Sequence, residues 1–162
     1  MHYVELAQLL ILLSFANGSP VIATRVFGKT FATPIDGNTQ FLDGRPLFGP
    51  SKTIRGILVS LLATTLAAPL LGLGFAVGLL VAATAMAGDL LSSFLKRRLG
   101  LPSSSRAIGL DQIPESLFPM LAWRSTFSLT AVDILVGCTI FLVGELLLSR
   151  LLFRLHLRDR PY

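Results

Sequence analysis

The sequence carries little charge, and that charge is unevenly distributed. Of 162 residues, 14% are charged and 52% are hydrophobic, whereas a soluble domain carries about a quarter charged residues. Residues 57–86 contain no charged side chain at all, and this run exceeds the ~20 residues that cross one hydrocarbon layer. Pro69, Gly72 and Gly74 lie near its middle, which favours two helices joined by a tight turn. The composition leaves no room for a separate soluble domain and predicts a single membrane-embedded domain over residues 1–162.

Cysteine is scarce as well, and the N-terminus lacks basic residues. Cys138 is the only cysteine, so an internal disulfide is excluded and no metal-ligand spacing is present. It lies in the apolar run 134–148 and is interpreted as a packing residue. Neither Lys nor Arg precedes Arg25, and no clear small-residue cleavage site is evident. Residues 4–22 are therefore predicted to form a retained first span rather than a signal peptide.

The placement of the cations predicts a topology. Lys and Arg follow the first span and gather again after residue 95, and the positive-inside rule assigns such segments to the cytoplasm. We expect an all-α polytopic protein with about five transmembrane helices, its N-terminus outside and its C-terminus cytoplasmic. The expected spans are residues 4–22, 53–71, 73–95, 115–130 and 134–152, with cytoplasmic loops 23–52 and 96–114. The cations behind this topology are Arg25, Lys29, Arg45, Lys52, Arg55, Lys96, Arg97, Arg98, Arg106, Arg150, Arg154, Arg158 and Arg160.

The fourth expected span is short and contains Arg124 beside Trp123. An arginine within a span usually faces the protein interior or a wet cavity, and is a functional candidate for that reason. Alternatively, its long side chain snorkels to a nearby interface. The sequence leaves both interpretations open.

The first cytoplasmic loop is rich in glycine and proline, with the sequence TPIDGNTQFLDGRPLFGPSKTIRG over residues 33–56. Glycine lets a backbone approach a ligand closely, and exposed amides at a helix start suit phosphate. Lys52 and Arg55 add full positive charges there. The stretch FGPSKTIRG is not a Walker A loop, and by itself this loop also fits a topological anchor.

The second polar cluster, GDLLSSFLKRRLG at residues 88–100, is more specific. Asp89, Ser93 and Lys96 or Arg97 share one face of a helix. The basic run alone is typical of a membrane anchor, but a carboxylate two turns inside such a helix is costly unless it meets a cation or water. Asp89 is therefore interpreted either as an ion-pair partner of Arg97 or as a metal ligand.

The third cluster, GLDQIPES at residues 109–116, supplies Asp111 and Glu115. Asp111 alone could cap the fourth helix. Together with Asp89, it forms a pair of hard oxygen ligands of the kind that Mg²⁺ takes alongside water and substrate phosphates. Because all three clusters are expected on the cytoplasmic side, their combination favours an active site over an anchor.

Four motifs in order resemble the CDP-archaeol synthase family, the CTP-dependent cytidylyltransferases of archaeal ether-lipid synthesis. They are ANGSPV (16–21), DGRPLFGPSKTIRG (43–56), GDLLSSFLKRRLG (88–100) and LDQ (110–112). The resemblance covers nearly the whole chain. The family is distantly similar to phosphatidate cytidylyltransferase, which shares an S-x-x-K-R element and a later aspartate.

The resemblance implies a reaction and a set of site residues. CMP would pass from CTP to a lipid phosphate such as a geranylgeranyl ether glycerophosphate, giving a CDP-activated lipid and pyrophosphate with Mg²⁺ as the cofactor. By position, Asp89 and Asp111 would hold the metal and would be catalytic together with Lys96 and Arg97. The residues implied for nucleotide binding are Asn17, Lys52, Thr53, Arg55, Gly56 and Arg98.

The chain departs from the family pattern in two places, which leaves alternatives open. Archaeal members often carry a glycine where this chain has Pro50-Ser51, and an acidic and aromatic pair where it has residues 113–116. Transfer to diacyl phosphatidate stays an alternative, since prenyl and acyl chains both need only apolar helix faces. A small multi-pass transporter is disfavoured, because the acids accompany a basic cluster and no repeat is evident. A CDP-alcohol phosphotransferase is disfavoured because its DGxxAR signature is absent.

The expected partners are CTP, the lipid phosphate and the bilayer. The cations flank spans, where anionic lipid and topology account for them, so nucleic acid is not an expected partner. Residues 4–11 and 144–155 are candidate surfaces for a homodimer. The expected location is the cell (inner) membrane, with the active site facing the cytoplasm.

Overall fold

The computed structural model describes residues 2–105 and 107–154. Its elements are α1 (Tyr3–Phe27), α2 (Ile54–Ala67), the 3₁₀ turn η1 (Ala68–Leu71), α3 (Phe75–Arg98), α4 (Gln112–Ala122) and α5 (Ala131–Arg154). The described residues form helices, turns and two isolated bridges, without a strand. The all-α prediction is therefore confirmed. Arg106, Arg158 and Arg160, which contributed to the predicted topology, lie outside the described residues.

Among the described residues, four helical stretches are long and apolar enough to cross a membrane. These are α1, α2 with η1 (Ile54–Leu71), α3, and α5 over Ala131–Leu151. Large apolar side chains cover their outer faces; Leu58, Leu62 and Leu66, for example, form an exposed row along α2. An apolar surface of this extent suits contact with lipid rather than water. The multi-pass membrane architecture is thus confirmed.

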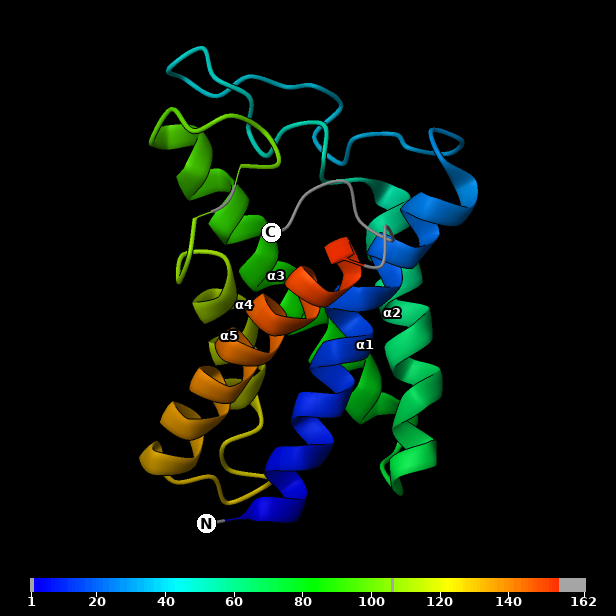
Figure 1. The fold of residues 1–162 in the computed structure, drawn as a ribbon, viewed down its shortest axis with the longest axis vertical. Coiled ribbons are helices and arrows are strands. Elements are labelled where there is room, and N and C mark those ends of the chain that lie inside the picture. Colours follow the sequence, from blue (N-terminus) through cyan, green and yellow to red (C-terminus); the bar gives the residue numbers. More distant parts are fainter. Residues whose placement is uncertain (1, 106, 155–162) are drawn as a thin grey trace.

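The helices alternate in direction along the chain (Figure 1). At one end, the His2 backbone N–H lies 3.4 Å from Asp133 Oδ1, so the starts of α1 and α5 are neighbours. The segments 28–53 and 99–105 lie at the opposite end, at the top of Figure 1. Helix α5 therefore begins beside the start of α1 and runs toward the end that holds these segments (Figure 1).

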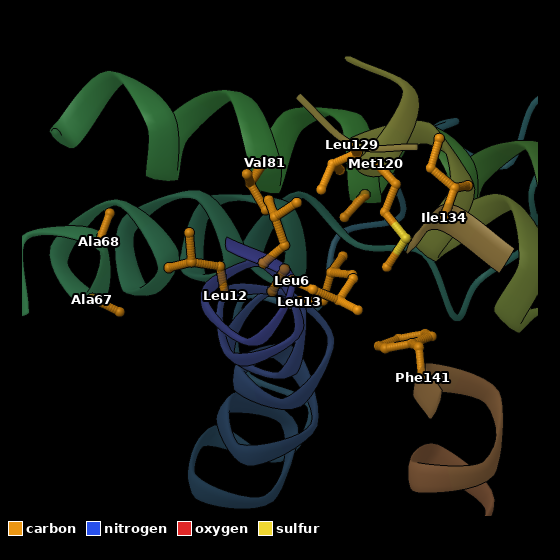
Figure 2. Packing of buried hydrophobic residues seen from close by; sticks show 13 residues of the cluster. Leu6, Leu12, Leu13, Ala67, Ala68, Val81, Met120, Leu129, Ile134 and Phe141 are labelled. Carbon is orange, nitrogen blue, oxygen red and sulfur yellow. The ribbon is translucent and has the colours of Figure 1, made fainter. Parts of the chain in front are cut away.

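Helix α1 lies at the centre of the packing and contacts α2, α3, α4 and α5. Its buried residues recur at the spacing of one helical face, which faces apolar side chains of the other helices (Figure 2). The core comprises Leu6, Leu9, Leu12, Leu13, Ala16, Ala67, Ala68, Val81, Ala85, Met120, Leu129, Ile134 and Phe141.

Helix α4 differs from the fourth predicted span, residues 115–130. It has 11 residues, which is about 16 Å of helix, whereas the hydrocarbon core is about 30 Å thick. Residues 123–128 form turns, and Arg124 is exposed within them. Because these turns lie at the end of the molecule that holds the start of α1 (Figure 1), Arg124 fits the interface interpretation rather than a place in a buried cavity.

Specific side chains lie at two shifted helix boundaries. Helix α5 begins at Ala131 rather than at residue 134, because Thr130 and Asp133 form a reciprocal capping box: Asp133 Oδ2 accepts the Thr130 N–H at 3.0 Å and Thr130 Oγ1 accepts the Asp133 N–H at 3.1 Å. Helix α1 continues to Phe27 rather than ending at residue 22. Just past that end Arg55 donates to the carbonyl oxygens of Gly28 and Thr30, and it donates to Thr24 Oγ1 within α1 at 3.3 Å, so its side chain joins the end of α1 to the start of α2.

Candidate active site

A cavity of about 650 Å³ lies between α1, the start of α2, α3, α4 and α5. Its charged lining includes four cations and four acids from segments that are far apart in the sequence. They are Arg25, Lys52, Lys96, Arg97, Asp89, Asp111, Glu115 and Glu145. A cavity lined by both signs of charge suits a ligand that combines phosphate groups with a metal cation.

Gly88 allows α4 to lie directly against α3. A Cβ atom at this position would lie 2.2 Å from the carbonyl oxygen of Pro114 and 2.8 Å from the backbone nitrogen of Glu115. Ser92 Oγ adds a hydrogen bond across the same contact, to the Asp111 carbonyl oxygen at 3.4 Å. The absence of a side chain at Gly88 thus brings the first turn of α4, which carries Glu115 and directly follows Asp111, next to Asp89 of α3.

Lys52 is the ion-pair partner of Asp89. Its Nζ lies 2.5 Å from Asp89 Oδ1 and 2.6 Å from Oδ2. Burial disfavours the ammonium group, but the neighbouring Asp89 carboxylate outweighs this effect and the pKa of Lys52 is raised. The alternative partner suggested by the sequence, Arg97, instead donates to the Pro102 carbonyl oxygen at 2.9 Å.

Asp111 forms a second ion pair, with Lys96. Lys96 Nζ lies 2.6 Å from Asp111 Oδ1 and also donates to the Ser105 carbonyl oxygen at 3.2 Å. The other carboxylate oxygen of Asp111 accepts the Ala107 N–H at 3.0 Å. The Asp111 side chain does not cap α4, so the capping role considered for it is not seen.

Two further carboxyl groups extend this cluster across the cavity. Glu115 is 6% exposed, and its carboxyl group lies within electrostatic range of that of Asp89. Glu145 of α5 lies within electrostatic range of Glu115. Glu115 was noted in the sequence but was not assigned to the site, and Glu145 was not identified as a site residue. The rule that a carboxylate within an apolar span is a functional candidate would have found Glu145.

Asn17, Thr53 and Gly56, implied for nucleotide binding, also line the cavity. Asn17 Nδ2 donates to the Leu13 carbonyl oxygen at 3.2 Å, one turn back in α1. Thr53 is the N-cap of α2, and its Oγ1 accepts the Gly56 N–H at 3.1 Å. The start of α2 is thereby held in contact with the cavity.

Arg55 and Arg98 lie elsewhere, since neither lines the cavity. Arg55 binds the end of α1, as described above. Arg98 pairs with Asp43 and donates to the Pro46 carbonyl oxygen at 2.6 Å. Its guanidinium carbon lies 4.8 Å from the Phe41 ring centroid and 5.0 Å from that of Phe94. These contacts attach the loop of residues 28–53 to the end of α3.

Asp36 organises the interior of that loop. It accepts the N–H groups of Phe48 and Gly49 at 2.9 Å each and that of Asn38 at 3.0 Å. Burial opposes ionisation, but the three backbone donors outweigh this effect and lower the pKa of Asp36. Lys52 follows directly after this ordered segment, with its carbonyl oxygen bound by the Ile35 N–H at 2.8 Å.

The oxygen ligands fit the requirements of Mg²⁺. Within the described residues, no group of three or more His, Cys, Asp or Glu is arranged to hold a metal by itself. Mg²⁺ needs only one or two protein carboxylates when substrate phosphates and water supply its other ligands. Asp89 and Asp111 line one cavity and meet that description.

Comparison with known proteins places this arrangement in context. A family model described as CarS-like, CDP-archaeol synthase, matches residues 65–162. The CDP-archaeol synthase of Pyrobaculum calidifontis is 33% identical over 98% of this chain and 99% of that protein. The CDP-archaeol synthase of Pyrococcus furiosus is 45% identical over 60% of this chain, and the aligned part spans 61% of that protein.

A solved structure has the same architecture. It is titled "Structural insight into an intramembrane enzyme for archaeal membrane lipids biosynthesis" and aligns with a TM-score of 0.71 at 28% sequence identity. The alignment covers 86% of this chain and 91% of that one. The similarity therefore covers most of the fold.

Proposed function

The chain belongs to the CDP-archaeol synthase family, and on that premise we propose that it transfers CMP from CTP to an archaeal-type lipid phosphate. A phosphate oxygen of the lipid attacks the α-phosphorus of CTP. The bond from this phosphorus to the oxygen that bridges to the β-phosphate breaks, and pyrophosphate leaves. The product is a CDP-activated lipid for phospholipid synthesis.

One observation carries the proposal: Asp89, Asp111, Lys52, Lys96 and Arg97 meet in one cavity although they come from three separate segments. A membrane anchor would need only the basic run beside a span. The convergence of the basic run with two acids and the start of α2 is instead what a reaction between two phosphate compounds requires.

The cations supply most of the chemistry that such a reaction needs. A phosphate monoester is already anionic near neutral pH, so its attacking oxygen needs no strong general base. The difficulty is to bring two anions together and to stabilise the leaving pyrophosphate, which is a matter of position and electrostatics. Lys52, Lys96 and Arg97 would bind the phosphate oxygens and neutralise the charge that develops on them.

Asp89 and Asp111 would hold Mg²⁺. When bound there, this ion would act as a Lewis acid on the phosphate oxygens and as a template for the nucleotide. The carboxylates themselves would keep the ion at the end of α3 where the three cations lie.

The apolar part of the cavity lining supports a lipid substrate. Val21, Ile57, Leu90 and Leu146 line the same cavity as the charged residues. They come from four helices that are apolar enough to span a membrane. A molecule with a phosphate head and hydrocarbon chains would contact both kinds of surface, and its chains would leave the cavity toward the bilayer.

We propose that this cavity faces the cytoplasm across the cell membrane. The loop of residues 28–53 and the end of α3 lie at the same end of the molecule (Figure 1). Both are rich in Lys and Arg, and the positive-inside rule assigns such segments to the cytoplasm. CTP is supplied on that side.

The proposal is tested by transfer of label from α-³²P-CTP into chloroform-extractable lipid. Full-length protein would be purified in detergent and incubated with Mg²⁺ and either a geranylgeranyl ether phosphate or a diacyl phosphatidate. We expect incorporation with the ether lipid and its loss in Asp89→Asn. Preference for the diacyl lipid would correct the substrate, and no incorporation with either lipid by folded protein would refute the activity.

A further inference from the structure

The carboxylates that would hold the metal already have a hydrogen-bond donor at every oxygen. Lys52 Nζ contacts both oxygens of Asp89, at 2.5 and 2.6 Å. Lys96 Nζ lies 2.6 Å from Asp111 Oδ1, and Asp111 Oδ2 accepts the Ala107 N–H at 3.0 Å. Each oxygen keeps a second lone pair, but an ammonium group this close repels a divalent cation that approaches the same oxygen, so binding of the cation favours displacement of at least one lysine.

Moving a lysine away from its carboxylate is unfavourable unless the ammonium group then pairs with a different anion. The exposed fraction of the side chain is 22% for Lys52 and 9% for Lys96, so neither ammonium group can be fully hydrated where it stands. A buried charge that loses its partner destabilises the protein strongly. The two ammonium groups would also repel an approaching divalent cation.

The triphosphate of CTP supplies the anion that the lysines need. Both lysines line the cavity where the nucleotide is proposed to bind. The flexible four-carbon stem of lysine lets its ammonium group move between neighbouring oxygens. If the cation binds Asp89 and Asp111 and the two ammonium groups bind phosphate oxygens, each of these charged groups has a partner of opposite charge.

We propose that Lys52 and Lys96 act as place-holders: without substrate, their ammonium groups neutralise the carboxylates that the divalent cation binds later. The cation and the nucleotide then bind as a unit. When the metal–nucleotide complex enters, the cation takes Asp89 and Asp111, and the two ammonium groups pass to the triphosphate. The free cation binds more weakly, because the lysines then give up their carboxylate partners without gaining phosphate oxygens. This inference rests on the proposed function, since it requires a nucleoside triphosphate that carries a divalent cation.

The test measures metal binding rather than turnover. Full-length protein in detergent is titrated with Mn²⁺, and bound and free ions are separated by their EPR signals. The titration is done alone and with α,β-methylene-CTP, in which the bond that the reaction breaks is replaced by a stable one. A protein-free titration corrects for Mn²⁺ held by the analogue. We expect at least tenfold tighter Mn²⁺ binding with the analogue, and the same factor for the analogue when Mn²⁺ is present.

Variants identify the lysines as the cause of this coupling. Lys52→Met removes a competing cation, so Mn²⁺ without nucleotide should bind at least tenfold more tightly than to the unmodified protein, with weaker coupling to the analogue. Lys96→Met tests the second pair independently. Lys29→Met, which removes an exposed lysine of the same loop, should change neither affinity.

Equal Mn²⁺ affinity with and without the analogue in the unmodified protein would overturn the inference, whether or not the variants fold. A folded Lys52→Met that binds Mn²⁺ no more tightly would also overturn it. Label transfer is measured on the same preparation. Transfer without coupling leaves the proposed function intact and refutes the place-holder role, whereas protein that neither transfers label nor binds the analogue refutes both.

Discussion

Replacing Gly88 with alanine tests whether the contact between α3 and α4 positions the active site. The added Cβ would lie 2.2 Å from the Pro114 carbonyl oxygen, whereas ordinary contacts begin at 3.4 Å. Backbone on both sides leaves no flexible side chain to yield, so the first turn of α4 must move away by about 1 Å. That turn carries Glu115 and follows Asp111 directly.

The expected magnitude follows from this displacement. A misplacement of about 1 Å in a catalytic constellation costs about a hundredfold in rate. Overpacking a close interface destabilises a protein by about 1–3 kcal/mol. We therefore expect Gly88→Ala to lower kcat/KM about a hundredfold and to lower the unfolding temperature in the same preparation.

Two matched variants separate position from packing. Gly78 is also tightly packed, since its Cβ would lie 2.6 Å from the Thr64 carbonyl oxygen, but it contacts α2 about 15 Å along the helix from Gly88. Gly78→Ala should lose comparable stability with a much smaller loss of kcat/KM. Gly144 of α5 has no atom within 4 Å of its Cβ position, so Gly144→Ala should be neutral or stabilising by about 0.5–1 kcal/mol.

The assay is label transfer from α-³²P-CTP over a range of CTP concentrations, with thermal unfolding measured on the same detergent-purified proteins. Wild-type turnover in a folded Gly88→Ala would refute the positioning argument. Equal losses of kcat/KM in Gly78→Ala and Gly88→Ala would show that general packing, rather than the place of α4, is responsible.

Three further outcomes are expected. Glu115→Gln should keep most label transfer because an amide can donate to the neighbouring Asp89 carboxylate, whereas Glu115→Leu should lose about 1.5–3 kcal/mol of transition-state stabilisation, roughly tenfold or more in kcat/KM; an inactive Gln variant would show that a carboxyl group is required at this position. Arg98→Met should lower the unfolding temperature, because Arg98 attaches the loop of residues 28–53 to α3, and the loosened loop should raise the KM for CTP. A raised KM at unchanged stability would instead indicate that Arg98 contacts the nucleotide directly. Because the pKa of Asp36 is lowered from its usual value of 3.8, its stabilising effect is present above that value and is lost as the pH falls below it. Thermal unfolding of Asp36→Asn should therefore depend less on acid than that of the unmodified protein, and an equal dependence would argue against this role.

The membrane helices were predictable because the requirement behind them is local. About 20 apolar residues cross a bilayer wherever they occur, so the uncharged run at residues 57–86 and its central turn sufficed to predict α2, η1 and most of α3. The start of α5 could also be predicted from the sequence, since the capping box of Thr130 and Asp133 spans only four residues. The end of α1 was not predicted, and the residues that follow it are held by Arg55, which belongs to another helix.

The members of the candidate site were largely predictable from residue type, whereas their contacts were not. Asp89 and Asp111 were identified because carboxylates near apolar spans need a cation or water, and the structure brings both to one cavity. Their lysine partners were not predicted, since the Lys52 and Asp89 pair joins residues 37 apart in the sequence through the folded loop that Asp36 organises.

Arg97 and Arg98 illustrate the division between sequence and tertiary structure. Sequence by itself determined that adjacent cations end the third helix and that an acid lies two turns before them. Adjacent residues on a helix point about 100° apart, so only one of the two arginines can face a given neighbour. The packing of α4 on Gly88 sets which face of α3 borders the cavity, and so places Arg97 in the cavity lining and Arg98 against the loop. That choice belongs to the tertiary structure, because it depends on how two helices meet and not on the composition of either one.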